Sequence, residues 1–341
     1  MRIGVLTGGG DAPGLNAAIR AVVFRSHQRG HEVCGIRDGW AGALDGTVQN
    51  LPLSFVRDIL PQAGTILGTS RANPLGTLPG SRETILRTLA GHGIGALVVI
   101  GGDATLMMAL KLHEAGFPTV GVPKTIDNYL AATDYCIGFD TAAGVVAESV
   151  DRVRATGRAH HRVMVVETMG RDVGWIATVG GLAGGADMIL IPEYPVGLDE
   201  VTARLRRRAA EGKDNSVIVV AEGSAPPGLG LAAETPGFTA GTGMAARGVG
   251  AALSDAIEQR TGFESRVTVL GHLQRGAAPS VVDRFWATRL GAKAADLIIE
   301  DAYGRVSVRH GELVEAVPLA RVLEEHRGVP KDLYEMTSIF D

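Results

Sequence analysis

A short polar segment, "PKTIDN" at residues 123–128, puts an amine, a hydroxyl and a carboxylate within four positions of one another. It follows an apolar run, "FPTVGV", that has the character of a strand. Phosphoryl transfer needs such a set: a cation for the phosphoryl charge, a hydroxyl donor, and a carboxylate that accepts the proton of the attacking alcohol. Because an ordinary turn needs none of these groups, Lys124, Thr125 and Asp127 are candidates for chemistry.

Three other turns after strand-like runs carry suggestive residues: "TGGGDAPG" at 7–14, "GTSRANP" at 68–74 and "GGDAT" at 101–105. Glycine turns at helix starts offer backbone amides to phosphate. Asp103 could hold Mg²⁺ beside phosphates, or simply cap the helix that follows. The glycines of the first turn miss the GxGxxG spacing, and Pro123 precedes the Lys-Thr pair where a Walker motif needs glycine. Both observations disfavour a nicotinamide enzyme or a P-loop enzyme.

The elements that must position these turns alternate along the chain. Near-continuous apolar runs such as "RIGVLT", "ALVVIGG", "RVMVVE" and "SVIVVAEG" indicate strands covered on both faces, and amphipathic stretches between them indicate helices. This alternation predicts an α/β fold with parallel sheets, in which ligands bind beyond the carboxyl ends of the strands. Two such series meet around Gly138, which predicts two lobes, and residues 223–248 predict a surface loop or hairpin.

Composition excludes several classes of protein. The net charge is −4 with scattered basic residues, which disfavours binding to nucleic acid or to an anionic membrane. Cys34 and Cys136 form no metal-like spacing, and no apolar run is long enough to span a bilayer. The amino terminus lacks the pattern of a signal peptide. We therefore expect a cytoplasmic protein.

Seven segments, in order and spread through nearly the whole chain, resemble successive signatures of the 6-phosphofructokinases. They are "LTGGGDAPGLNAAIR", "GTILGTSRANP", "GGDAT", "PKTIDN", "TDYCIGFDTA", "HHRVMVVETMGRDVGWIA" and "VTVLGHLQRG". The glycine turn, the lysine of "PKTIDN" and "MGRDVGWIA" resemble the branch that mixes ATP-dependent and pyrophosphate-dependent members. The resemblance implies a two-lobed phosphofructokinase-like fold with parallel-sheet, three-layer lobes. Its donor-binding lobe would span 1–138 plus about 274–324, and its sugar-phosphate lobe 139–273 plus about 325–341.

The resemblance also implies residue roles in an Mg²⁺-dependent transfer to fructose 6-phosphate. Asp127 would be the general base for the sugar 1-hydroxyl, and the other catalytic residues would be Thr125, Arg171 and Lys124. The donor phosphates would lie among Gly10, Arg71, Gly102, Ala104 and Thr105, with Asp103 near the metal. The sugar phosphate would contact Arg162, Met169, Gly170, Glu222, Arg266, His272 and Arg275. Two of these arginines would come from a neighbouring subunit, which implies a homodimer or homotetramer.

A structural alternative exists for the arginines of this set. Arg266 or Arg275 could instead pair with the nearby Glu264 or Asp283 on a solvated face. Similarly, Glu222 could be an ordinary loop carboxylate.

Tyr129 departs from the family pattern, which usually reads TIDND. A phenol is not ionised at neutral pH and cannot supply the charge of the missing aspartate to Mg²⁺. Metal binding would then rest on Asp103 and the donor phosphates, or the acceptor pocket is reshaped for another sugar phosphate such as sedoheptulose 7-phosphate. A non-catalytic sugar-phosphate sensor is the alternative of another class.

Ala104 bears on the donor. Pyrophosphate users commonly carry an aspartate at this position and ATP users a glycine, so an alanine, with one methyl and no charge, favours ATP. Lys124 occurs in pyrophosphate users and in some ATP users of this branch. We expect ATP as the donor, with pyrophosphate as the alternative.

Overall fold

The structure is a computed structural model that describes residues 1–230 and 248–339. It divides into two compact units, Met1–Thr141 with Arg275–Arg327 (unit 1) and Ala142–Gln274 with Gly328–Asp341 (unit 2). The sequence predicted that the donor lobe ends at residue 138 and again at about residue 324. The two segments of unit 1 end at residues 141 and 327. Most of the predicted loop at 223–248 lies outside the described residues.

Unit 1 is built on a seven-stranded sheet of order β11-β10-β5-β4-β1-β2-β3 within the described residues. Its five central strands run parallel, and the edge strands β3 and β11 run antiparallel to their neighbours. The strands are β1 (Arg2–Thr7), β2 (Glu32–Ile36), β3 (Val48–Asn50), β4 (Ile94–Gly101), β5 (Thr119–Pro123), β10 (Arg305–His310) and β11 (Leu313–Pro318). The predicted parallel α/β architecture is confirmed.

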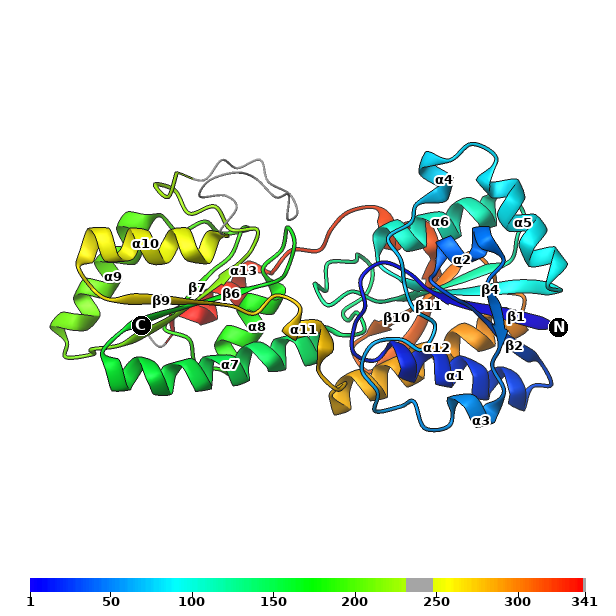
Figure 1. Cartoon of the computed structure of the whole chain (residues 1–341), viewed down its shortest axis with the longest axis horizontal. Helices are drawn as coiled ribbons and strands as arrows, with labels where there is room; N and C mark the ends of the chain where they lie inside the picture. Colours follow the sequence, from blue (N-terminus) through cyan, green and yellow to red (C-terminus); the bar gives the residue numbers. More distant parts are fainter. Residues whose placement is uncertain (231–247, 340–341) are drawn as a thin grey trace. The chain divides into compact units, whose positions relative to one another are not determined.

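Helices cover both faces of this sheet (Figure 1). The helical segments are α1 (Leu15–Gln28), α2 (Trp40–Asp45), α3 (Leu53–Val56), α4 (Pro74–Thr77), α5 (Ser81–Gly91), α6 (Asp103–Glu114), α12 (Val281–Ile299) and the 3₁₀ turn η2 (Leu319–Leu323). Helix α1 buries a broad apolar face in the core of unit 1, formed by Leu15, Ala17, Ala18, Ile19, Val22 and Val23. Helix α12 supplies Leu290 and other residues to the same core.

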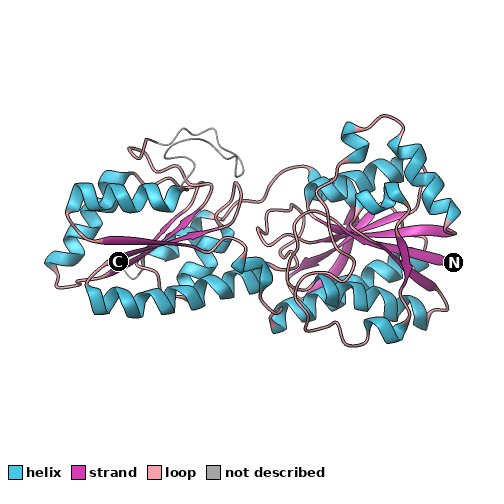
Figure 2. Ribbon diagram, viewed as in Figure 1, coloured by secondary structure: helices cyan, strands magenta, loops and turns pink. Residues whose placement is uncertain are grey.

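Unit 2 contains a four-stranded parallel sheet of order β7-β8-β6-β9 within the part of the chain that is described. Figure 2 shows these strands between two layers of helices. The strands are β6 (Val163–Thr168), β7 (Met188–Leu190), β8 (Ser216–Ala221) and β9 (Ser265–Val269). The helical segments are α7 (Phe139–His160), α8 (Trp175–Ala183), α9 (Leu198–Ala210), α10 (Val249–Thr261), α11 (Leu273–Gly276), α13 (Lys331–Glu335) and the 3₁₀ turn η3 (Met336–Ser338). Of these, α7 begins and α11 ends within the residues of unit 1.

A buried carboxylate in unit 1 joins the start of α12 to the segment after "PKTIDN". Asp283 has no exposed surface and accepts hydrogen bonds from the Tyr135 hydroxyl (2.6 Å) and the Thr141 amide (2.9 Å). It also accepts from the Gly138 amide and the Thr141 hydroxyl. Because each of these donors is buried and needs an acceptor, Asp283 fixes the backbone path of residues 135–141.

Replacing Asp283 with alanine should therefore lower the free energy of unfolding by about 3 kcal/mol or more, since several buried donors lose their acceptor. Chemical denaturation of the purified variant measures this change. Glu300→Ala, an exposed position that follows the same helix, is the matched control and should shift the free energy of unfolding by less than about 0.5 kcal/mol. Equal stability of the two variants would contradict the assigned role of Asp283.

Candidate active site

Three neighbouring parallel strands of unit 1 end at one edge of the sheet. Strands β1, β4 and β5 are adjacent, so their carboxyl ends bring together the glycine turn at 8–14, the Gly102–Asp103 pair and the 124–128 loop. The Gly8 amide donates to the Ile100 carbonyl (3.0 Å) and the Lys124 amide to the Gly101 carbonyl (3.0 Å). Ligand sites of open α/β sheets occupy this kind of edge.

The glycine turn and the "GGDAT" loop approach each other too closely for larger residues. A Cβ atom at Gly8 would lie 2.6 Å from the Thr105 methyl group, and one at Gly101 would lie 2.4 Å from it. The chain therefore needs glycine at both positions. Thr105 is 4% exposed and packs between the two turns, which fixes the distance between them.

The Lys124 side chain binds the backbone of the glycine turn. Its side chain is buried, and its Nζ donates to the carbonyl oxygens of Gly8 (2.9 Å) and Gly10 (2.5 Å). Burial, with a smaller contribution from the positive charge of Arg275, lowers the pKa of Lys124 to about 8. The ammonium group thus organises the turn by donating to two of its carbonyl oxygens.

The predicted base lies in a loop that is held by its own side chains. The Thr125 hydroxyl donates to Asp127 Oδ2 (3.1 Å) and accepts from the Asp127 amide (3.2 Å), and both residues are 7% exposed. Asn128 adopts a left-handed conformation (φ 55°), and its Oδ1 accepts from the Cys136 amide (2.8 Å). These contacts set the position of the Asp127 carboxylate.

Asp103 is the first residue of α6, where the helix dipole favours a negative charge. Its carboxylate is partly exposed and lies beside Tyr129 and His326. Among the described residues no group of three or more His, Cys, Asp or Glu side chains could hold a metal ion. A single carboxylate fits Mg²⁺ that is held largely by donor phosphates and water, because Mg²⁺ in kinases needs only one or two carboxylates from the protein.

The other predicted donor residues lie at the same edge or near it. Ala104 is exposed in the first turn of α6, and Gly102 precedes that helix. Arg71 is exposed and directly follows a loop residue that contacts the glycine turn. That contact runs through Ser70, whose carbonyl accepts from the Gly9 amide (2.9 Å). Within unit 1 the structure therefore brings these donor candidates to one region.

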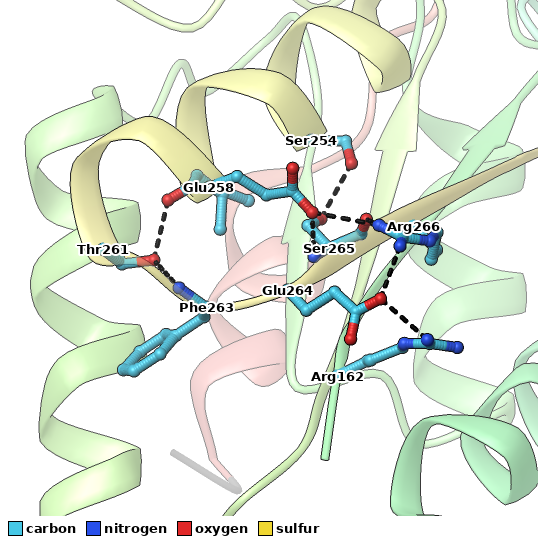
Figure 3. Close-up of polar contacts among 9 residues, drawn as sticks. Arg162, Ser254, Glu258, Thr261, Phe263, Glu264, Ser265 and Arg266 are labelled. Atoms are coloured by element: carbon cyan, nitrogen blue, oxygen red, sulfur yellow. Dashed lines mark hydrogen bonds and ion pairs between the residues drawn. The ribbon is translucent and has the colours of Figure 1, made fainter. Parts of the chain in front are cut away.

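Two predicted sugar-phosphate arginines in unit 2 meet on one carboxylate (Figure 3). Arg162 pairs with Glu264 (2.7 Å between Nη2 and Oε1), and Arg266 pairs with the same oxygen and also with Glu258 (3.0 Å). The hydrogen bond from Arg162 is the main reason that the pKa of Glu264 is lowered. The pairing of Arg266 with Glu264, the structural alternative raised by the sequence, is thus present, and it places the two guanidinium groups side by side.

Glu222 shapes a second group of predicted residues in unit 2. It directly follows β8, and its Oε1 accepts from the amides of Gly170 (3.2 Å) and Arg171 (2.9 Å). Arg171 has a left-handed backbone (φ 55°), and its side chain is 45% exposed. The carboxylate therefore holds the 169–171 turn, in which Arg171 Nε lies 3.4 Å from Asp172 Oδ2 and Met169 is half-buried.

His272 and Arg275 stand apart from these two groups. His272 is exposed in unit 2, whereas Arg275 belongs to unit 1. There its Nη1 donates to the Asp11 carbonyl (2.7 Å), and a Cβ atom at Gly10 would lie 2.7 Å from this nitrogen. Arg275 thus packs on the glycine turn and does not pair with Asp283 as the structural alternative had it.

Sequence reasoning missed two side chains at these sites. Glu167, at the end of β6, is buried, accepts from the Gly250 amide (2.7 Å) and has a pKa raised by burial. An acidic residue in the otherwise apolar run "VMVVET" was the available signal. His326 lies beside Asp103 through a long-range contact, and no local pattern marks it.

Comparison with known proteins now identifies the family. The family model described as "Phosphofructokinase" matches residues 2–298. The chain belongs to the phosphofructokinase family. The pyrophosphate–fructose 6-phosphate 1-phosphotransferase of Amycolatopsis methanolica is 48% identical over 341 residues, covering 100% of this chain and 99% of that protein. The ATP-dependent 6-phosphofructokinase of Halalkalibacterium halodurans is 44% identical and covers 98% of each chain. The predicted family is confirmed, and relatives of this phosphofructokinase carry both donor names.

Solved phosphofructokinase structures confirm the two-lobed fold. The phosphofructokinase of Saccharomyces cerevisiae matches with a TM-score of 0.83 and 31% identity over 95% of this chain, which spans 45% of the yeast chain. A pyrophosphate-dependent phosphofructokinase from Nitrosospira multiformis matches with a TM-score of 0.85 at 21% identity, which supports the fold alone.

Among the described residues, no helix has the length and apolarity that crossing a membrane requires.

The low pKa of Lys124 predicts a pH dependence of stability. The folded protein releases this proton near pH 8, whereas the unfolded chain keeps it to about pH 10.5. Between these values the unfolded chain binds more protons, so this contribution to the free energy of unfolding rises with pH. Relative to Lys124→Met, the wild-type protein should gain about 2 kcal/mol between pH 7 and pH 10.

Urea denaturation at several pH values measures this gain, with Lys111→Met as the matched control because Lys111 is exposed. The control should follow the wild-type curve. A constant difference between wild type and Lys124→Met across this pH range would contradict the assignment of a buried, weakly basic amine.

Proposed function

We propose that this phosphofructokinase transfers a phosphoryl group from ATP to the 1-hydroxyl of fructose 6-phosphate. The observation that carries the proposal is the buried Asp127–Thr125 pair at the carboxyl end of β5, beside a glycine turn and an acidic helix start. A fixed carboxylate can accept the alcohol's proton as the phosphoryl group arrives in line. The surrounding dipoles and cations lower the cost of the charge that develops.

Each residue near the donor has a distinct task in this proposal. Asp127 takes the proton of the sugar hydroxyl, and the Thr125 hydroxyl holds that carboxylate and can also reach a phosphoryl oxygen. The backbone amides of the glycine turn and of Gly102 to Thr105 bind the donor phosphates. When bound, Mg²⁺ would neutralise donor charge, and Asp103 is the residue that would hold it. Lys124 stabilises the conformation of the glycine turn and places a positive charge next to it.

Two observations support ATP as the donor. Ala104 is exposed and uncharged at the start of α6, so nothing at this position repels or obstructs the α-phosphate of a nucleotide. The Lys124 ammonium is directed at backbone carbonyl oxygens, so its presence does not argue for pyrophosphate. Pyrophosphate is the second candidate, because relatives at 45% to 48% identity carry the pyrophosphate-dependent name.

The sugar phosphate would be gripped by residues of unit 2. Arg162 and Arg266 already lie on one carboxylate, so a phosphate that displaces Glu264 would meet two guanidinium groups at once. Met169, Gly170 and Glu222 would contact the sugar, and His272 would add a contact to its distal phosphate. The roles expected for Arg171, at the transferring group, and for Arg275, which belongs to unit 1, stay predictions. The exposed Val267 and Val269 on the edge strand β9 support the predicted homo-oligomer. A cytoplasmic location also stays a prediction.

Asp127→Ser tests the proposed base. We expect turnover to fall by about 10³-fold or more, because the alcohol loses its proton acceptor. The Michaelis constant for the donor should change little, since Asp127 does not bind the donor phosphates. Steady-state kinetics with coupled detection of the bisphosphate product measures both quantities.

Asp45→Ser is the matched control, because Asp45 is exposed at the end of α2 in the same unit. It should retain wild-type turnover. Turnover of Asp127→Ser within tenfold of wild type would refute the proposed base.

A matrix of two donors and two acceptors tests the substrates. ATP or pyrophosphate is combined with fructose 6-phosphate or sedoheptulose 7-phosphate, with and without Mg²⁺, and the products are identified by ³¹P NMR. The proposal requires the highest kcat/KM for ATP with fructose 6-phosphate, and only with Mg²⁺. A higher value for pyrophosphate selects the second donor, and tight sugar-phosphate binding without any product would make the protein a sensor.

A further inference from the structure

Two aromatic rings flank the carboxylate of Asp103 in unit 1. The Tyr129 hydroxyl donates to Oδ1 of Asp103 (2.7 Å), and Nε2 of His326 lies 3.6 Å from Oδ2. The two rings contact each other, with centroids 4.5 Å apart and planes tilted by 41°. Each oxygen of the carboxylate thus faces one ring, in an arrangement that involves three distant parts of the chain.

Tyr129 is held in place by its surroundings. It is 4% exposed, and its carbonyl oxygen accepts from the Arg327 amide (2.6 Å). Leu130 and His326 also form an isolated antiparallel bridge, so the backbones that carry the two rings are tied together. Burial confines the phenol ring between these segments, and its hydroxyl is a preorganised donor.

The hydroxyl also lies at the start of α6. A Cβ atom at Gly102 would be 3.1 Å from the Tyr129 oxygen, so the phenol fills the space next to the helix start. The Asp103 carboxylate is partly exposed, and fixing its orientation costs rotational entropy. The hydrogen bond from Tyr129 favours one orientation of the carboxylate.

The choice of a phenol has an electrostatic consequence. A tyrosine hydroxyl is neutral at neutral pH, so it orients Asp103 without adding negative charge. A second carboxylate at this place would repel the phosphates of the donor. An orienting group without charge therefore suits a site where the metal arrives on a polyanion.

We propose that Tyr129, backed by the ring of His326, is a positioning residue that aims the Asp103 carboxylate at the metal–donor complex. This proposal rests on the proposed function, because it assigns Tyr129 to the donor step and not to the choice of sugar phosphate. A purely structural tyrosine would fill space only, and the loss of its hydroxyl would leave metal–donor binding unchanged.

Tyr129→Phe tests the proposal, because it keeps the ring and removes one oxygen atom. Binding is measured by Mn²⁺ electron paramagnetic resonance with two non-transferable donors, adenylyl imidodiphosphate and imidodiphosphate. We expect Mn²⁺–donor dissociation constants to rise about fivefold or more in the variant, since a hydrogen bond to a charged group is lost. The Michaelis constant for the sugar phosphate should stay within twofold of wild type.

Tyr303→Phe is the matched control, since the Tyr303 hydroxyl also donates to an aspartate of unit 1, Asp301, but on the surface. It should bind Mn²⁺–donor complexes like the wild type. Tyr129→Phe added to Asp103→Asn should cause no further loss, because the two residues act through one contact. An additive loss, or an unchanged affinity of Tyr129→Phe, would overturn the proposal.

Failure of the proposed function gives a different result. If the wild-type protein binds neither Mn²⁺–donor complex, both the function and the role of Tyr129 are refuted. If the wild type binds one of them and Tyr129→Phe binds it equally well, only the role of Tyr129 is refuted.

Discussion

The proposed donor side of this phosphofructokinase depends on one buried ammonium group. Lys124 follows β5, and its Nζ reaches the carbonyl oxygens of Gly8 and Gly10 in the turn that follows β1. This contact ties together two strands that are separated by β4 in the sheet. The contact fixes the shape of the turn, and the burial of the amine lowers its pKa.

Much of this arrangement follows from sequence patterns. Continuous apolar runs predicted the parallel strands, and the polar turns that follow them predicted which residues meet at the carboxyl edge. Groups that lie close in sequence could therefore be predicted to act together, as Thr125 and Asp127 do within one loop. The ordered motifs added the family, which the comparisons confirm.

Contacts between residues far apart in the chain could not be predicted from the sequence in the same way. Lys124 has the residue type of a phosphate ligand, but its burial on two carbonyl oxygens depends on how closely the turns approach, which glycine spacing alone does not fix. Arg275 was grouped with the sugar-phosphate residues, and its guanidinium lies on the Asp11 carbonyl in unit 1. The contact of Tyr129 with Asp103 requires the fold itself, because nothing in "TIDNY" indicates which way the phenol points.

A crystal structure with a non-transferable donor and Mg²⁺ tests the central claim most directly. The account predicts donor phosphates on the amides of the glycine turn and of the α6 start, with Lys124 still on the carbonyl oxygens of Gly8 and Gly10. Donor phosphates bound elsewhere, or a Lys124 side chain that has left the turn to contact phosphate directly, would contradict it.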